Sequence, residues 1–178
     1  MKKQTVWLVG MMGAGKSTVG RIVARHLDRP FVDTDAEVER AAGRSIAEIF
    51  AGEGEPAFRG RERQAVEAVC GREAVVALGG GAMAQPGARE RLAGSGIVVY
   101  LRSRPETLLA RLGQSAGRPL LGEGGAGERL ERLRDLLGDR EPAYQTASLT
   151  VDTDDARPEE VAETVARRIR EQWEAGPR

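Results

Sequence analysis

Short apolar runs alternate along this chain with segments whose apolar positions recur at helical spacing. The apolar runs lie at residues 5–10, 31–35, 74–81, 96–102 and 149–153, and they predict buried strands. The first helical pattern between them carries Val19, Ile22, Val23 and Leu27 on one face. Because strands that alternate with helices form parallel sheets covered on both faces, the pattern predicts an α/β fold.

Local signals support the positions of these helices. Ser45 and Glu48 form the Ser-x-x-Glu pattern of a capping box, and Pro105 and Pro158 stand near first-turn positions. A glycine-rich stretch within residues 113–142 leads into a charged helix, and it predicts either a mobile lid or a plain solvated loop. With 178 residues, the chain suits one domain over residues 1–178.

Composition argues against several classes of function. The 27 basic and 27 acidic residues leave no net charge, and aromatic residues make up only 4%, which disfavours binding to nucleic acid. One cysteine and one histidine give neither an internal disulfide nor a zinc cluster, so a reducing cytoplasm fits. No stretch approaches the roughly 20 apolar residues that cross a membrane. The apolar run near the start ends in a glycine-rich motif, so we interpret it as a strand and not as a signal peptide.

The stretch GMMGAGKST, at residues 10–18, follows the first apolar run and precedes the first helical pattern. Gly10, Gly15, Lys16 and Ser17 fill the pattern G-x-x-x-x-G-K-[ST] of a phosphate-binding loop. Together with Gly13, the glycines let successive N–H groups point inward, and the following helix adds its positive end. Lys16 is expected to reach the outer phosphates, and the Ser17 hydroxyl is expected to bind Mg²⁺. The alternative is a glycine-rich turn with a solvated lysine.

Two aspartates follow the second predicted strand in the sequence DTD. Side chains alternate along a strand, so Asp33 and Asp35 are expected on the same side of an extended segment. One carboxylate could hold Mg²⁺ through water while the other accepts a hydrogen bond from an alcohol. The alternative is that one of them, above all Asp35, caps the helix that follows.

Two further motifs add an arginine and a run of glycines. Arg59 and Glu62, in FRGRE, lie three positions apart on a predicted helix, so Glu62 could orient Arg59 to grip a carboxylate. Taken alone, however, this spacing favours the alternative of a surface salt bridge. Glycines at residues 79–81 end the third strand, where they either let a ligand touch the backbone or form a tight turn. Ligands collect at the carboxyl ends of parallel strands, so residues 10–17, 33–35 and 79–81, each of which follows a predicted strand, should share one crevice.

Taken together, GMMGAGKST, DTD, SIAEIF, GEPAFRGRE, GGG, GRPLL and DREPAY resemble the shikimate kinases in order and spacing, from about residue 5 to about residue 170. The resemblance implies a five-stranded parallel sheet in the order 2-3-1-4-5, between two helical layers. It implies substrate-binding helices at about residues 34–62 and a lid at about residues 113–126. The implied activity is transfer of the γ-phosphoryl group of ATP to the 3-hydroxyl of shikimate, with Mg²⁺, in the route to chorismate and the aromatic amino acids.

The resemblance also implies a donor side. The residues that would bind the nucleotide are Gly13, Ala14, Gly15, Lys16, Ser17, Thr18, Arg111, Arg118 and Arg157. Lys16 would contact the β- and γ-phosphates, and Ser17 would complete the metal site with a water held by Asp33. Arg118 would swing in over the phosphates from the lid. Arg111 and the segment DDARP, which contains Arg157, would enclose the adenine.

On the acceptor side, the resemblance implies that Asp35 binds the ring hydroxyls and accepts or orients the proton of the attacking oxygen. Arg59 and Arg140 would hold the substrate carboxylate, while Gly80 and Gly81 would contact shikimate through the backbone. Lys16, Asp35 and Arg118 would therefore form the catalytic set. We expect a cytoplasmic monomer. The alternatives are a kinase for another small polyol acid such as gluconate, and a nucleotide-binding module without activity.

Overall fold

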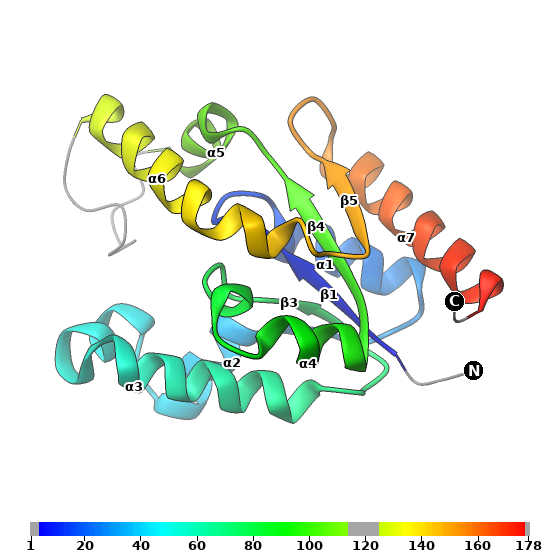
Figure 1. Cartoon of the computed structure of the whole chain (residues 1–178), viewed down its shortest axis with the longest axis horizontal. Helices are drawn as coiled ribbons and strands as arrows, with labels where there is room; N and C mark the ends of the chain where they lie inside the picture. The colour runs from blue at the N-terminus through cyan, green and yellow to red at the C-terminus, as the bar shows by residue number, and fades with distance from the viewer. Residues whose placement is uncertain (1–3, 114–124, 177–178) are drawn as a thin grey trace.

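A parallel sheet of five strands lies at the centre of the computed structural model, which describes residues 4–113 and 125–176 (Figure 1). The strands are β1 (Thr5–Val9), β2 (Phe31–Asp33), β3 (Val75–Ala77), β4 (Gly96–Arg102) and β5 (Leu149–Asp152). Their order is β2-β3-β1-β4-β5, and every pair is parallel. Both features confirm the prediction from the sequence. β2 and β3 are shorter than the predicted runs at residues 31–35 and 74–81, because the chain leaves the sheet after Asp33 and after Ala77.

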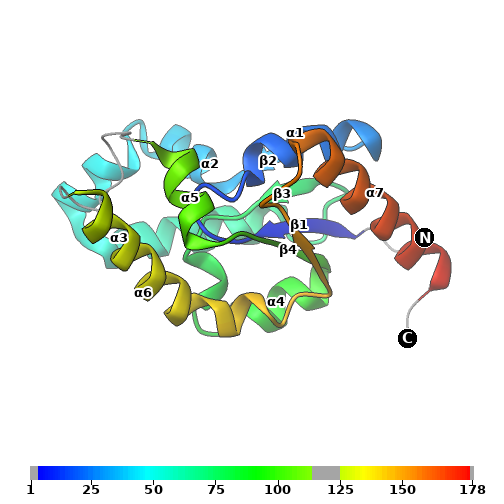
Figure 2. The same cartoon turned by 90° about the horizontal axis from the view of Figure 1, so that it is seen from above.

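Helices form a layer on each side of this sheet. They are α1 (Lys16–His26), α2 (Thr34–Ala42), α3 (Ile46–Val69), η1 (Ala82–Ala84), α4 (Ala88–Ser95), α5 (Pro105–Leu112), α6 (Ala126–Tyr144) and α7 (Pro158–Ala175). Figure 2 shows α1 and α7 on one side of the sheet and α4 and α6 on the other. The predicted three-layer arrangement is therefore correct. Most of the lid predicted at about residues 113–126 lies outside the described residues.

Local sequence accounts for these elements. Every residue of β1 is buried, because helices cover both faces of the central strand. Ser45 and Glu48 form the predicted capping box at the start of α3, and Pro105 and Pro158 occupy first-turn positions of α5 and α7. None of the helices in the described part of the chain is both long and apolar enough to span a bilayer.

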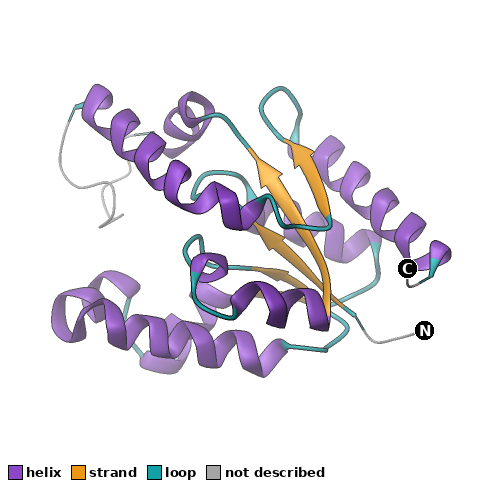
Figure 3. Ribbon diagram, viewed as in Figure 1, coloured by secondary structure: helices purple, strands orange, loops and turns teal. Residues whose placement is uncertain are grey.

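A small second core lies apart from the main one. This second core consists of Val38 from α2 and of Ile49 and Phe58 from α3, whereas the main core surrounds the sheet. α3 is interrupted at Gly54, whose φ of 80° lies in the left-handed region that glycine tolerates. Helix α2 and the first part of α3, which lie between DTD and Arg59 in the sequence, therefore have an apolar core of their own. Figure 3 shows that the loops after β1 and β3 leave the sheet at the end toward which the strand arrows point.

Candidate active site

The phosphate-binding motif forms a tight loop between β1 and α1. Gly13 and Gly15 have φ values of 81° and 91°, which L residues with side chains rarely adopt. Gly15 is the N-cap of α1, so the positive end of that helix faces the loop. The Lys16 Nζ donates hydrogen bonds to the carbonyls of Gly10 at 2.8 Å and Met11 at 2.9 Å, which holds the ammonium group over the loop. This geometry is that of an anion-binding loop.

Asp33 connects this loop to the start of α2. Its Oδ2 accepts a hydrogen bond from the Ser17 hydroxyl at 2.6 Å, and its Oδ1 accepts one from the backbone N–H of Asp35 at 3.1 Å. Asp33 is thus the N-cap of α2, and Asp35 lies in the first helical turn. The prediction that both aspartates lie on one extended segment is wrong, because this cap starts the helix directly after the strand. Asp35 is also not the helix cap.

Ser17 and Asp33 present oxygen atoms that suit Mg²⁺. This ion prefers oxygen ligands, keeps several of its waters and is bound through one or two protein groups. In the described ranges 4–113 and 125–176, no group of three or more His, Cys, Asp or Glu side chains could hold a metal ion. The close oxygen pair beside the phosphate-binding loop therefore fits a hydrated Mg²⁺, and it does not fit a fully protein-coordinated metal.

A cavity of about 720 Å³, here called the loop cavity, surrounds the phosphate-binding loop. It brings together the predicted nucleotide-binding residues Gly13, Ala14, Gly15, Lys16, Ser17, Thr18, Arg111 and Arg157, together with Asp33 and Asp35. Arg111 is held by Thr153, whose Oγ1 accepts from its Nη1 at 2.9 Å. Arg157 forms an exposed ion pair with Glu160 at 2.9 Å. Arg118 lies outside the described residues.

Arg59 is held by two carboxylates of very different exposure. Its Nη1 lies 2.8 Å from Glu62 Oε2, and its Nη2 lies 2.9 Å from Glu55 Oε1. The Glu62 side chain is 3% exposed, whereas that of Glu55 is 57% exposed. Burial raises the pKa of Glu62; burial also opposes charge on Arg59, but the two carboxylates outweigh it and raise the pKa of Arg59. The pair with Glu62 is therefore buried, and the alternative of a surface salt bridge is wrong for it.

The glycine turn after β3 is crowded by charged side chains. A Cβ atom at Gly79 would lie 2.4 Å from Glu62 Oε1 and 2.6 Å from Asp35 Oδ1, and one at Gly81 would lie 2.8 Å from Arg59 Nη2. Real Cβ atoms do not approach other heavy atoms so closely. A side chain at either position would therefore displace the charged ends of these side chains.

Hydrogen bonds with two side chains, Thr34 and Tyr144, hold this turn. The backbone N–H of Gly79 donates to Thr34 Oγ1 at 3.0 Å, and the Tyr144 hydroxyl donates to the carbonyl of Gly80. Burial raises the pKa of Tyr144 to about 12, so its hydroxyl remains a donor at neutral pH. Sequence reasoning missed Thr34 and Tyr144. Thr34 could have been noticed between two candidate aspartates, whereas nothing in the sequence links Tyr144 to the glycines.

A second cavity, of about 380 Å³ and here called the arginine cavity, joins these groups. Its lining includes the predicted acceptor residues Asp35, Arg59, Gly80, Gly81 and Arg140, and it also includes Phe50, Phe58 and Glu62. Arg140 comes from α6 and is only 7% exposed. Met12, Lys16 and Asp35 line both the loop cavity and the arginine cavity. An anion on the phosphate-binding loop and an anion held by Arg59 and Arg140 would therefore both lie next to the Lys16 ammonium and the Asp35 carboxylate.

Comparison with known proteins gives the same family across most of the chain. The family model described as shikimate kinase matches residues 12–170. The shikimate kinase of Chlorobium chlorochromatii is 44% identical over 171 residues, which cover 92% of this chain and 90% of that protein. The shikimate kinase of Thermobifida fusca is 46% identical over 164 residues, which cover 91% of this chain and 92% of that protein.

Solved structures agree with the sequence relatives. The shikimate kinase of Acinetobacter baumannii in complex with shikimate superposes with a TM-score of 0.89 at 40% identity, covering 94% of this chain and 93% of that one. A gluconokinase of Sinorhizobium meliloti gives a TM-score of 0.63 at 18% identity, covering 99% of each chain, which shows a shared fold alone. The family match, the relatives and the structural agreement show that this chain belongs to the shikimate kinase family.

Proposed function

We propose that this chain transfers the γ-phosphoryl group of ATP to the 3-hydroxyl of shikimate, with Mg²⁺ bound at Ser17 and Asp33. The observation that supports this most strongly is that the loop cavity and the arginine cavity share Lys16 and Asp35. Phosphoryl transfer needs little covalent help from the protein, and it depends on alignment and charge stabilisation. A shared cation and carboxylate between two anion sites supply both.

On the donor side, the Lys16 ammonium would exchange its hydrogen bonds with the loop carbonyls for the β- and γ-phosphates. The Ser17 hydroxyl would turn from Asp33 to Mg²⁺, and Asp33 would hold a water of the ion. When bound, Mg²⁺ would supply positive charge next to the phosphate oxygens. Arg111 and Arg157 would flank the adenine. Arg118, outside the described residues, remains proposed as the arginine that neutralises the transferring phosphoryl group.

On the acceptor side, Arg59 and Arg140 would hold the substrate carboxylate, because an arginine can bind a carboxylate through two parallel hydrogen bonds. Asp35 would orient the 3-hydroxyl toward the donor and accept its proton as the bond to phosphorus forms. The backbone at Gly80 and Gly81 would complete the contacts. Apolar walls from Phe50 and Phe58 support a ring acceptor over an open-chain polyol acid.

A coupled assay for ADP across a panel of small hydroxy acids tests this function. We expect ADP formation that depends on shikimate, ATP and Mg²⁺, with gluconate far weaker. No stimulation by shikimate, or preference for gluconate, would refute the proposal. Calorimetry tests the alternative of an inactive module, which would bind nucleotide without binding shikimate.

Two variants separate the proposed roles. Arg59→Ala should raise the KM for shikimate severely and leave the KM for ATP almost unchanged, because the proposed substrate contact of Arg59 is to the acceptor carboxylate and not to the nucleotide. Asp35→Asn should lower kcat by about 100-fold or more, the usual contribution of a general base. Equal losses for both substrates in the first variant, or normal turnover in the second, would contradict these roles.

We also propose that the chain acts as a monomer in the cytoplasm. Its only cysteine suits a reducing compartment. Sedimentation velocity at assay concentrations tests the first statement, and fractionation of the source cells tests the second.

A further inference from the structure

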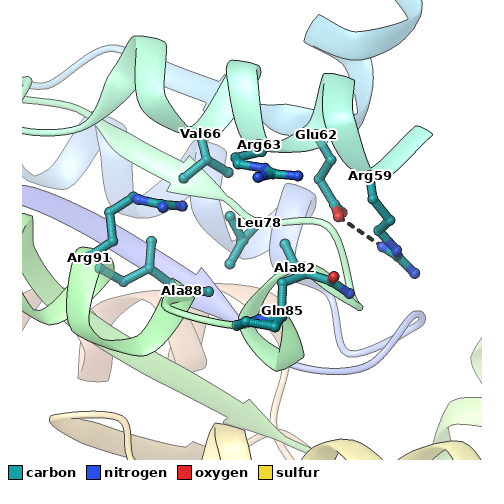
Figure 4. Close-up of a pocket in the computed structure, with 11 residues that line it drawn as sticks. Arg59, Glu62, Arg63, Val66, Leu78, Ala82, Gln85, Ala88 and Arg91 are labelled. Carbon is teal, nitrogen blue, oxygen red and sulfur yellow. Dashed lines mark hydrogen bonds and ion pairs between the residues drawn. The ribbon is translucent and has the colours of Figure 1, made fainter. Parts of the chain in front are cut away.

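A smaller cavity lies behind Arg59 and Glu62, between α3, η1 and α4 (Figure 4). Its volume is about 170 Å³. A cavity of about 150 Å³ lined by apolar side chains can hold a benzene molecule, so a single six-membered ring fits this space. The apolar part of the lining consists of Val66, Leu78, Ala82, Pro86, Ala88 and Leu92.

Two arginines give this cavity a positive rim. Arg63 comes from α3 and Arg91 from α4, and Figure 4 shows both side chains beside the apolar lining. Among the described residues, Arg63 has no carboxylate within 4.0 Å, and Arg91 has only Glu67, at 4.0 Å. Among the lining residues, Arg59, Arg63 and Arg91 outnumber the one carboxylate, Glu62, and this excess of positive charge favours an anionic ligand.

The lining also limits the chemistry of that ligand. Gln85 is the one uncharged polar side chain among the lining residues, so most ring hydroxyls would be buried without hydrogen bonds. A polyol acid such as the proposed acceptor is therefore a poor fit. An apolar ring with one carboxylate satisfies both the apolar lining and the positive rim.

We propose that this cavity binds a single-ring aromatic carboxylate between Arg63 and Arg91, and that its occupation weakens binding of the acceptor in the arginine cavity. The second part depends on the function proposed above for the arginine cavity. Arg59 and Glu62 line both cavities, and Arg59 lies one helical turn from Arg63. A negative charge here therefore opposes a second carboxylate on Arg59. Two like charges about 10 Å apart repel enough to raise KM about two-fold at the dielectric constant of bulk water and about fifteen-fold at that of a protein surface.

Benzoate is the probe for this site, and its binding is measured first without shikimate or ATP. We expect benzoate to bind the full-length protein in an NMR titration, and we expect the neutral amide benzamide to bind at least ten-fold more weakly. The double variant R63Q/R91Q should weaken benzoate binding at least ten-fold and leave kcat and the KM for shikimate unchanged. Arg89→Gln is the matched control, because Arg89 lies on α4 and does not line the cavity.

Kinetics then test the effect on the acceptor. Rising benzoate should increase the KM for shikimate to a plateau, without change in kcat or in the KM for ATP, and R63Q/R91Q should abolish the increase. If benzoate instead occupies the arginine cavity, KM will rise without a plateau, R63Q/R91Q will still bind it, and Arg140→Ala will not. That result would overturn the proposal, as would no binding at about 10 mM or binding without an effect on KM. Because binding is measured without substrates, failure here is distinct from failure of the kinase assay.

Discussion

Replacement of Glu55 by glutamine tests whether this residue competes with the substrate for Arg59. Glu55 Oε1 accepts hydrogen bonds from Nε of Arg59 at 3.1 Å and from Nη2 at 2.9 Å. If Arg59 holds the substrate carboxylate as proposed above, that carboxylate would meet the negative charge of Glu55 and would have to displace it from one side of the guanidinium group. Glutamine keeps the length of the side chain and removes its charge. We therefore expect Glu55→Gln to lower the KM for shikimate.

The size of this effect follows from the exposure of Glu55. Its side chain is 57% exposed, so its ion pair is of the surface class, which contributes about 0.2–1 kcal/mol. Since about 1.4 kcal/mol corresponds to a factor of ten, KM should fall about 1.4- to 5-fold. Salt screens exposed charges, so the difference from wild type should be largest at low ionic strength. The kcat should not change, because Glu55 is not among the residues that line either cavity.

Steady-state kinetics with shikimate as the varied substrate, at low and high salt, measure this effect. Glu53→Gln is the matched control: Glu53 lies two residues earlier in α3 and pairs with Arg44 and Arg61 in place of Arg59. Its KM should stay at the wild-type value. A higher KM in Glu55→Gln would refute the reasoning, because it would mean that Glu55 orients Arg59 for the substrate. An unchanged KM at both salt concentrations would refute it as well.

Three further substitutions test buried contacts, two of them in the site and one between α1 and the sheet. Thr34→Val keeps the volume but removes the acceptor for the buried N–H of Gly79, so urea denaturation should show a loss of about 1–3 kcal/mol; a loss below about 0.5 kcal/mol would contradict this. Burial raises the pKa of Glu62, so the folded protein binds this proton more tightly than the unfolded chain does, and the contribution of Glu62 to stability falls as pH rises above about 4.3. The loss of unfolding free energy caused by Glu62→Gln should therefore become smaller as pH rises. A loss that increases with pH would mean that the ion pair with Arg59 affects the pKa of Glu62 more than burial does. Gly20→Ala would place a Cβ 2.5 Å from Cε2 of Phe31, and the resulting overpacking should cost about 1–3 kcal/mol in the same denaturation assay; an unchanged midpoint would contradict it.

The sequence predicted those parts of the structure that depend on local patterns. Continuous apolar runs located all five strands, because buried parallel strands need apolar residues on both faces. The capping box at Ser45 and the loop from Gly10 to Ser17 were equally local, and the structure confirms their geometry. The order of the strands came from the resemblance to shikimate kinases and not from the periodicity.

The remainder depended on contacts that spacing alone does not reveal. Asp33 and Asp35 were expected on an extended segment, but the chain turns into α2 as soon as Asp33 caps it. The bond from Tyr144 to Gly80 joins residues 64 positions apart, so no local pattern indicates it. The ion pair between Glu55 and Arg59, by contrast, could have been predicted from the sequence. Glu55 lies four residues before Arg59 on the same helix, a spacing that places the two side chains next to each other.

Glu55 and Glu62, the two carboxylates that pair with Arg59, differ in burial and are therefore expected to differ in function. Glu62 is buried, so loss of its ion pair with Arg59 would leave an unpaired charge in the interior. The pair between Glu62 and Arg59 should therefore persist when the substrate binds. Glu55 is exposed, so water can replace Arg59 at little cost. Gly79 keeps Glu62 and Asp35 close to one backbone position, and this links the orientation of Arg59 to that of the proposed base. In the function proposed above, Glu62 would therefore orient Arg59 before the substrate arrives, and the substrate carboxylate would replace Glu55.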